Sequence, residues 1–597
     1  MAAADTASSS QVPPASGVRE EAQLAFPSPF TFIANNPVPL VEFRLRRFAR
    51  EILAKPRWWE KVFDEDIVTR WKREFAEHDR ATVENYWGGE KRLEEGNGEK
   101  QWPRDPITEA QLQYLFDELR YMANQRDEST GISPTTIPMV YESPALISQE
   151  LKGAIKSLAE KLQDVPDYEK DWHPGSNKQV LDLVHPSLFC LRIDRSFIHY
   201  PLSRHNDQFQ QLTLEEYYRK RPDIERQATQ TWQRDRMDSL MPFDFTVSKA
   251  YQWLPTDFAV SEDGRVTPLS YINNLNPADH PEAYLTIPSI LERFIPMFER
   301  VASDELSPRP ECPFPIEPDA WYCDVYDECP DLDGDELDEW YRIHRWPFLP
   351  EINPFQPPKP NSRVDFSLNG RTLQVIVKMA NIVLTPENPT YPGGSWHVEG
   401  MANERVIATG LYYYDSDNIS ESRLLFRAAV GDGECNSGTM LTYDQYDYRG
   451  YLVVYGVTND VQLNQQLGHI VALEDKCIVF PNIYQHRVAP FELTDHSCPG
   501  HRKILAFFLV DPLNPIHSTT VVPPQNAQWY KDAIYSCRAF QQLPVELVDV
   551  ILGYVLEGTI TLEQAKADRE ELMKERAQFL VNHNEELFEA PFSMCEH

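Results

Sequence analysis

The spacing of apolar residues changes along the chain, and this change predicts its organisation. From about Val41 to Leu162, apolar residues recur three and four positions apart, which is the pattern of amphipathic helices. Helices are predicted at residues 109–124, 151–162 and 283–301, the first of them after Thr108, a typical N-cap. The pattern therefore predicts a helix-rich N-terminal region over residues 31–345.

The pattern becomes strand-like after the proline-dense stretch Pro347–Pro360. Leu373–Leu384 is rich in β-branched residues and is bounded by Gly370 and Pro386. Further strands are predicted at Val406–Tyr414, Leu424–Val430, Tyr451–Val457, His469–Leu473, Cys477–Phe480 and Lys503–Val510. Short strands separated by turn residues are typical of a barrel or jelly roll, so residues 346–520 are predicted to form a β domain.

The two ends differ from both regions. Residues 1–30 are rich in Ala, Ser and Pro, lack the apolar segment of a secretory signal and are expected to be disordered. Residues 521–597 are predicted to form a C-terminal helical segment packed on the core, with helices at Leu543–Leu556 and Leu562–Leu580. The predicted fold class is α+β, with a double-stranded β-helix (jelly roll) in the C-terminal half.

The charge balance narrows the choice of partners. The 597 residues include 57 Lys and Arg against 92 Asp and Glu, a formal net charge of −35. Nucleic acids and anionic membranes need a clustered basic surface, and the chain has no basic run of useful length. No apolar run approaches the length of a membrane span. We therefore expect neither a nucleic acid nor a membrane as partner.

Nine cysteines are scattered along the chain without a C-x-x-C pair. This pattern argues against a disulfide framework and against a structural zinc site, and it favours reduced thiols in a reducing compartment. A cytoplasmic location is the expectation that follows.

The first candidate for chemistry is the segment Ser395–Met401, which follows the turn Pro392-Gly393-Gly394. On extended backbone, residues two positions apart point to the same face, so His397 and Glu399 are predicted to project side by side. An imidazole and a carboxylate in that arrangement suit a divalent metal. A second histidine would complete a 2-His-1-carboxylate set with open positions for substrate and dioxygen.

The second histidine is predicted to be His486, at the end of a strand-like run 87 residues after Glu399. Closing a jelly roll can bring such distant strands together. Sixteen residues later Arg502 begins the apolar strand Lys503–Val510. A charge buried there needs an anionic partner, and a carboxylate is the best match for a guanidinium.

These residues, in this order, resemble the double-stranded β-helix family of Fe(II)/2-oxoglutarate-dependent dioxygenases. The resemblance implies that His397, Glu399 and His486 are the catalytic metal ligands and that they hold Fe(II). It implies that Arg502 binds the distal carboxylate of 2-oxoglutarate, with Tyr412 as the tyrosine that hydrogen-bonds to the same group. The usual carboxylate ligand of that family is Asp, whereas this chain has Glu.

Over most of its length beyond about residue 40, the sequence also resembles a large fungal family labelled domain of unknown function 4246. The stretches that carry this resemblance are Val180–Leu188, Ser270–Leu275, Ala380–Tyr414, Pro481–Pro512 and Leu562–Glu575. The expected function is an Fe(II)/2-oxoglutarate-dependent dioxygenase that oxidises a C–H bond of a small-molecule substrate. Two alternatives stay open: a cupin-like metalloprotein that does not use 2-oxoglutarate, and a non-catalytic binding or scaffold protein. The sequence leaves the oligomeric state open.

Overall fold

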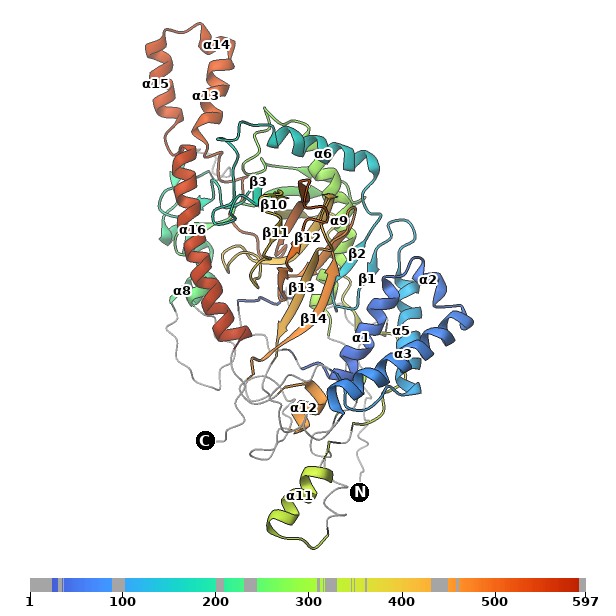
Figure 1. Ribbon diagram of the computed structural model, residues 1–597. Coiled ribbons are helices and arrows are strands. Elements are labelled where there is room, and N and C mark those ends of the chain that lie inside the picture. Colours follow the sequence, from blue (N-terminus) through green and yellow to red (C-terminus); the bar gives the residue numbers. More distant parts are fainter. Residues whose placement is uncertain are drawn as a thin grey trace, which may run out of the picture.

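The computed structural model describes residues 24–30, 35, 37–88, 102–199, 209–229, 244–308, 312–314, 316, 330–344, 346–347, 349–359, 362–430, 449–457 and 461–589. Most of the predicted leader, residues 1–30, lies outside this set. Within the set, no helix combines the length and the apolar character needed to cross a membrane. The architecture is mixed α and β with many antiparallel strands (Figure 1).

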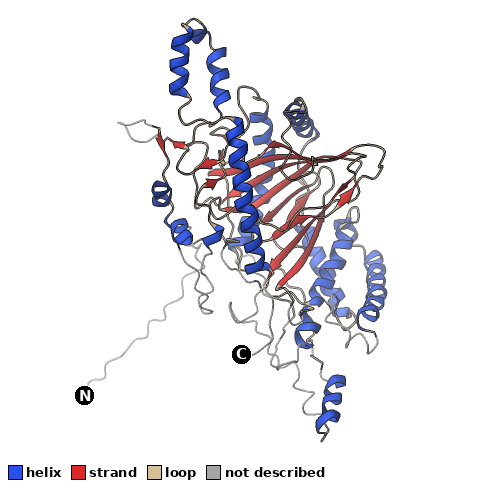
Figure 2. Ribbon diagram, turned by 60° about the vertical axis from the view of Figure 1, so that its left-hand side comes forward, coloured by secondary structure: helices blue, strands red, loops and turns tan. Residues whose placement is uncertain are grey.

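A nine-stranded antiparallel sheet forms the centre of the molecule (Figure 2). Its order is β1-β2-β15-β12-β18-β10-β8-β9, with β3 also paired to β10. The strands are β1 (Ser133–Pro134), β2 (Tyr141–Ser143), β3 (Val180–Val184), β8 (Thr256–Val260), β9 (Val266–Pro268), β10 (Thr372–Leu384), β12 (Val406–Asp417), β15 (Cys477–Pro481) and β18 (Gly500–Val510). Five of these strands come from the region expected to be helix-rich, so the sheet extends across the boundary at residue 346.

A smaller sheet faces the central one. It has the order β14-β13-β16, from Asn464–Val471, Arg423–Ala429 and Gln485–Val488. A two-stranded ribbon pairs β11 (Thr390–Tyr391) with β17 (Phe491–Glu492). Buried side chains of both sheets share one apolar core, which includes Ile376, Tyr413, Phe426, Ile478 and Phe508. This layer between the sheets is where the candidate site lies.

Helices cover the opposite face of the central sheet. The helix α9 (Ala283–Leu306) packs there, with α6 (Gln149–Gln163) nearby (Figure 1). Gly410 of β12 permits the close approach of α9, because a Cβ at this position would lie 2.9 Å from ring atoms of both Phe294 and Phe298. The phenylalanine rings therefore pack directly on the strand backbone.

Most of the remaining helices form two groups. A cluster with its own apolar core contains α1 (Leu40–Leu53), α2 (Trp58–Lys61), α3 (Glu65–Trp87) and α5 (Glu109–Gln125). The predicted cap of α5 is confirmed, since Thr108 Oγ1 accepts a hydrogen bond from the Gln111 amide at 3.2 Å. The C-terminal helices are α13 (Ala527–Ser536), α14 (Arg538–Gln541), α15 (Val545–Val555) and α16 (Leu562–His583), followed by a π-helical turn η5 (Asn584–Phe588). Figure 1 shows α13 to α15 projecting from the body and α16 running along it.

Shorter elements complete the described part of the chain. They are β4 (Leu191–Arg192) paired with β7 (Tyr251–Gln252), β5 (Phe197–Ile198) paired with β6 (Gln210–Gln211), α7 (Leu214–Lys220), α8 (Pro222–Thr229), the 3₁₀ turn η2 (Asp244–Thr246), α11 (Gly334–His344) and α12 (Arg449–Tyr455). The strand predicted at Tyr451–Val457 was wrong, because most of this segment belongs to α12. Residues 450–455 are all buried, and an apolar run this short has no periodicity that separates a strand from a buried helix.

Candidate metal centre

Two histidines 89 positions apart in the sequence lie side by side between the sheets. The backbones of His397 and His486 form an antiparallel bridge. The amide of His397 donates to the carbonyl of His486 at 3.1 Å, and the amide of His486 donates back at 2.9 Å. Directly opposed residues project to the same face. The two imidazole centroids are accordingly 4.4 Å apart.

Glu399 completes the group. Its Oε1 lies 3.4 Å from Nε2 of His486 and 3.8 Å from Nε2 of His397. One donor atom from each of the three residues lies within 4.8 Å of the others, a spacing that permits a shared metal ion. Val398 between them points into a separate apolar core, as the alternation of extended backbone requires. The structure therefore brings the three predicted ligands together.

The turn before the histidine is fitted to the neighbouring strand. Gly393 has a φ of +91°, and a Cβ there would lie 2.8 Å from the carbonyl oxygen of Val488. The amide of Gly394 donates to that same carbonyl at 3.0 Å. Only glycine combines this backbone conformation with so close an approach. The turn thus places the following residues against β16, which carries His486.

Hydrogen bonds orient two of the ligands. Nδ1 of His397 donates to the carbonyl of Ser395 at 2.8 Å, which leaves the lone pair on Nε2, the atom that faces Glu399. Asn482 holds the backbone of Glu399: its Oδ1 accepts from the Glu399 amide at 2.8 Å, and its Nδ2 donates to the Glu399 carbonyl at 2.9 Å. Nothing in the sequence pattern marked Asn482. Its role depends on contacts between segments 83 residues apart.

The three groups influence one another's protonation. Burial by itself favours the neutral form of Glu399, but the two imidazoles outweigh it and hold the pKa of this carboxyl well below its usual range. Burial lowers the pKa of His397, but the hydrogen bond and the charge of Glu399 outweigh this effect, so the net shift of the pKa is upward. Burial and the neighbouring His397 lower the pKa of His486. An ionised carboxylate beside imidazoles is the protonation state that binds a cation.

Arg502 is buried between the sheets, and no carboxylate of the described residues pairs with it. It is only 3% exposed, and its Nη1 donates to Ser422 Oγ at 2.6 Å. Its Nε has no hydrogen-bond partner among the described residues, and no Asp or Glu of that set forms an ion pair with it. The guanidinium lies 5.5 Å from the ring centroid of Tyr413 and 5.4 Å from that of Phe491. Burial lowers the pKa of Arg502.

The tyrosine beside Arg502 is Tyr413, and not Tyr412 as predicted from the sequence. The side chain of Tyr412 lies on the other face of β12, in the core under α9, where its hydroxyl is buried without a hydrogen-bond partner among the described residues. Two irregularities in the pairing of β12 with β18, at 406/408 and 413/415, shift which residues face the smaller sheet. Between these irregularities Leu411 and Tyr413 face the smaller sheet and Tyr412 faces α9, so the tyrosine implied by the resemblance lies on the face away from Arg502.

Lys378 of β10 is a further cation near the site. Its charge opposes protonation of both histidines: it adds to the lowering of the pKa of His486 and works against the upward shift of His397. It forms no ion pair within the described chain. His501, next to Arg502 in β18, points away from the site as its position predicts, because its Nε2 lies 2.9 Å from Oδ2 of Asp415.

Comparison with protein families identifies the chain at the level of a family. A family model described as "Protein of unknown function (DUF4246)" matches residues 109–533, and one described as "Domain of unknown function DUF4246, N-terminal" matches residues 7–74. The chain belongs to the DUF4246 family. The three clustered residues and Arg502 all lie within the longer match to DUF4246. The comparison with curated proteins found no match.

Two solved structures show weak similarity to this DUF4246 chain. The first, IDO from Bacillus thuringiensis, has 14% identity and a TM-score of 0.14 over 24% of this chain and 46% of that one. The second, the Fe(II)/(alpha)ketoglutarate-dependent dioxygenase TqaL, has 12% identity and a TM-score of 0.21 over 45% of this chain and 69% of that one. The chain therefore spans less than half of the first structure. TM-scores this low support no argument about fold or activity.

Proposed function

We propose that this chain is a non-haem Fe(II)- and 2-oxoglutarate-dependent dioxygenase that oxidises a C–H bond of a small-molecule substrate. The observation that carries the proposal is a 2-His-1-carboxylate cluster in the same layer between two sheets as a buried arginine that has no carboxylate partner in the described part of the chain. Neither feature is specific alone, because clusters of ionisable side chains and buried arginines also occur as structural elements of folds. Together they match a site that must hold a metal ion and an oxoacid at the same time.

The strand order supports a double-stranded β-helix. Four adjacent strands of the central sheet, β15-β12-β18-β10, face β14-β13-β16, and the β11–β17 ribbon and the His397–His486 bridge continue the smaller sheet. Along the chain, β10, β12, β15 and β18 belong to the central sheet, and the segments between them supply the other one. Such an exchange between two sheets is typical of a jelly roll, and it supports the proposed fold. It places the first ligand pair and the second histidine on adjacent strands.

The donor set suits Fe(II). Two imidazole nitrogens and one carboxylate oxygen from His397, Glu399 and His486 leave open positions on a six-coordinate metal. Nε2 of His397 is free to bind because Nδ1 is engaged by the Ser395 carbonyl. When bound, Fe(II) supplies the dioxygen chemistry and 2-oxoglutarate supplies electrons for it. Asn482 would hold the backbone of the ligand Glu399 in place, and Phe480 packs on the ligand His486 with the ring centroids 4.9 Å apart.

The surroundings of Arg502 suit a carboxylate. A guanidinium binds a carboxylate with two parallel hydrogen bonds, and this one has a free buried Nε while Nη1 is used by Ser422. A buried cation that lacks a partner is costly, so an anion that pairs with Arg502 would relieve this cost. The distal carboxylate of 2-oxoglutarate is such an anion. Tyr413, in place of Tyr412, is the tyrosine positioned to contact it.

The test is anaerobic loading of the protein with Fe(II) and 2-oxoglutarate, observed by the visible charge-transfer band of the iron chelate. We expect the band in the unsubstituted protein, its loss in Arg502→Met with iron still bound, and loss of iron itself in His486→Ala. Iron binding without the band would favour the cupin-like alternative. Absence of iron binding would favour a scaffold protein.

A further inference from the structure

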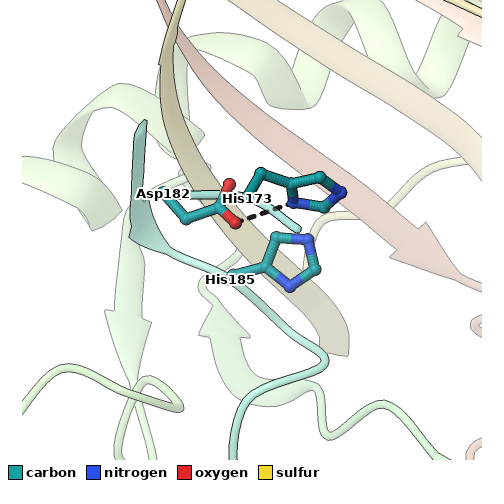
Figure 3. Close-up of side chains that lie close together, drawn as sticks. All are labelled: His173, Asp182 and His185. Atoms are coloured by element: carbon teal, nitrogen blue, oxygen red, sulfur yellow. Dashed lines mark hydrogen bonds and ion pairs between the residues drawn. The ribbon is translucent and has the colours of Figure 1, made fainter. Parts of the chain in front are cut away.

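A second cluster of two histidines and a carboxylate lies at the edge of the central sheet, outside the proposed iron centre. Figure 3 shows His173, Asp182 and His185 converging. Nδ1 of His173 lies 2.8 Å from Oδ2 of Asp182, and the two imidazole centroids are 5.1 Å apart. One donor atom from each residue lies within 4.8 Å of the others. The same donor types therefore occur together a second time.

Backbone pairing fixes the positions of these donors. Asp182 belongs to β3 and pairs with Ala380 of β10. The segment before β3 folds back along it, with the His173 amide donating to the Val180 carbonyl at 2.9 Å and the Asp182 amide donating to the Asp171 carbonyl at 3.0 Å. His185 follows the end of β3 by one residue. The cluster is thus built on a strand of the main sheet and does not depend on a free loop.

Two buried oxygen atoms at the cluster lack partners. Asp182 is 6% exposed, and its Oδ1 has no hydrogen-bond partner among the described residues. The same holds for Oδ1 of Asn274, whose Nδ2 donates to the carbonyl of His185 at 2.7 Å. A cavity of about 210 Å³ adjoins them, lined by Glu169, Asp171, Asp182, Leu183, His185, Leu188, Phe189, Asn274, Asn526, Leu562 and Lys566. It is large enough for several water molecules.

Two basic side chains bear on whether the cluster can take a cation. Lys378 acts electrostatically on both Asp182 and His185, as it does on the two histidines of the first cluster, and a bound ion has to coexist with its charge. Arg569 approaches Oδ2 of Asp182 to 4.0 Å, but it is engaged by Asp171 through two contacts of 2.6 and 2.9 Å. Its charge is therefore already balanced. Arg569 also differs from Arg502 in this respect, so the second cluster has no unpaired guanidinium to receive an oxoacid. The chemistry expected here is consequently that of a metal without 2-oxoglutarate.

One hydrogen bond of His185 competes with metal binding. The Ser187 amide donates to Nδ1 of His185 at 3.2 Å, which places the proton of a neutral imidazole on Nε2. Coordination through Nε2 requires this proton to move to Nδ1 and the contact with Ser187 to open. A single long hydrogen bond is weak compared with a metal–nitrogen bond, so a bound ion can displace it.

We propose that His173, Asp182 and His185 form a Zn²⁺ site with a fourth position open to water in the adjoining cavity. Two nitrogens and one oxygen with an open position form a donor set that Zn²⁺ takes in proteins. The cysteine pattern had argued against structural zinc, but a histidine–aspartate site needs no cysteine. The ion satisfies the carboxylate of Asp182 and ties the segment around His173 to β3.

The test isolates this site by using the full chain with His397→Ala and His486→Ala, which remove the proposed iron centre. After chelator treatment, this background is loaded with Zn²⁺, passed through gel filtration and assayed for metal by mass spectrometry. We expect about one Zn²⁺ per chain, and none after the further change His173→Gln. The side chain of His173 is partly exposed, so this variant is expected to fold. The control is His501→Gln, which breaks a similar histidine–aspartate contact of 2.9 Å elsewhere and should retain the metal.

A second readout covers the case in which His173→Gln does not fold. The background protein is loaded with Co²⁺, whose visible absorption distinguishes four-coordinate nitrogen and oxygen ligation from hydrated ion, and Asp182→Asn is compared with it. An unchanged Zn²⁺ content in folded His173→Gln would overturn the proposal, as would a background that binds no Zn²⁺ or gives only the spectrum of hydrated Co²⁺. Because the readout is metal content, these outcomes are independent of whether the iron centre is a dioxygenase.

Discussion

Replacement of Arg502 by methionine should separate ligand binding from folding. The guanidinium is 3% exposed, lacks a carboxylate partner in the described chain and keeps one hydrogen bond, to Ser422 at 2.6 Å. If it binds 2-oxoglutarate, the variant loses two charge-assisted hydrogen bonds of about 1.5–3 kcal/mol each. Together that loss is about 3–6 kcal/mol, which corresponds to an increase of about 100-fold to more than 10,000-fold in the Kd for 2-oxoglutarate.

The same substitution should leave the ligand-free protein as stable as the unsubstituted protein, or make it more stable. The contact with Ser422 contributes roughly 1 kcal/mol, and its loss is destabilising. Replacing a buried charge by an apolar side chain of similar volume is often neutral or stabilising by about 1–4 kcal/mol. We therefore expect a melting temperature equal to or above that of the unsubstituted protein.

The assay is calorimetric titration of 2-oxoglutarate into Mn²⁺-loaded protein, together with thermal melts without ligand. Lys503→Met is the matched control, since Lys503 lies next to Arg502 in β18 but pairs with Asp415 at 2.8 Å. It should lower the melting temperature and leave the Kd unchanged. A normal Kd in Arg502→Met would refute the assigned role, and a strongly lowered melting temperature would show that Arg502 stabilises the fold.

Three further predictions follow from particular contacts. Tyr413→Phe should raise the Kd for 2-oxoglutarate by about tenfold, the worth of one hydrogen bond to a charged group, whereas Tyr412→Phe should not alter it in the same titration. Gly410→Ala should destabilise the protein by about 1–3 kcal/mol in denaturant unfolding, because its Cβ meets Phe294 and Phe298 at 2.9 Å; Gly153→Ala, with no atom within 4 Å of its Cβ, should not. Burial lowers the pKa of His583 from 6.5 to about 4. As the pH falls, His583 takes up a proton in the unfolded chain before it does so in the folded protein. The contribution of neutral His583 to the free energy of unfolding is therefore complete above pH 6.5 and declines as the pH falls to about 4. By linkage the decline is on the order of 3 kcal/mol. The free energy of unfolding, measured with urea, should differ less between pH 5 and pH 7 in His583→Gln than in the unsubstituted protein. An equal difference in the two proteins would contradict the prediction.

The juxtaposition of His397 and Glu399 could be predicted from local sequence, whereas His486 was proposed from the expected jelly roll and the family resemblance. His397 and Glu399 are two positions apart on extended backbone, and this spacing is sufficient to place both on one face. The strand β18 was predicted within three residues, and the alternation along it placed Arg502 and His501 on opposite faces. Helices with strong periodicity and a capping residue, such as α5, were predicted within one residue at each end.

Only the tertiary structure decided the features that depend on contacts between distant segments. The pairing of β12 with β18 places Tyr413, and not Tyr412, on the face that carries Arg502. Asn482 holds Glu399 across 83 residues, and His173 meets Asp182 because a segment folds back on β3. Local sequence determines which face a side chain takes, because backbone geometry repeats every two residues. Which groups meet on that face, and whether a buried charge finds a partner, depends on strand pairing and register, which local sequence does not encode.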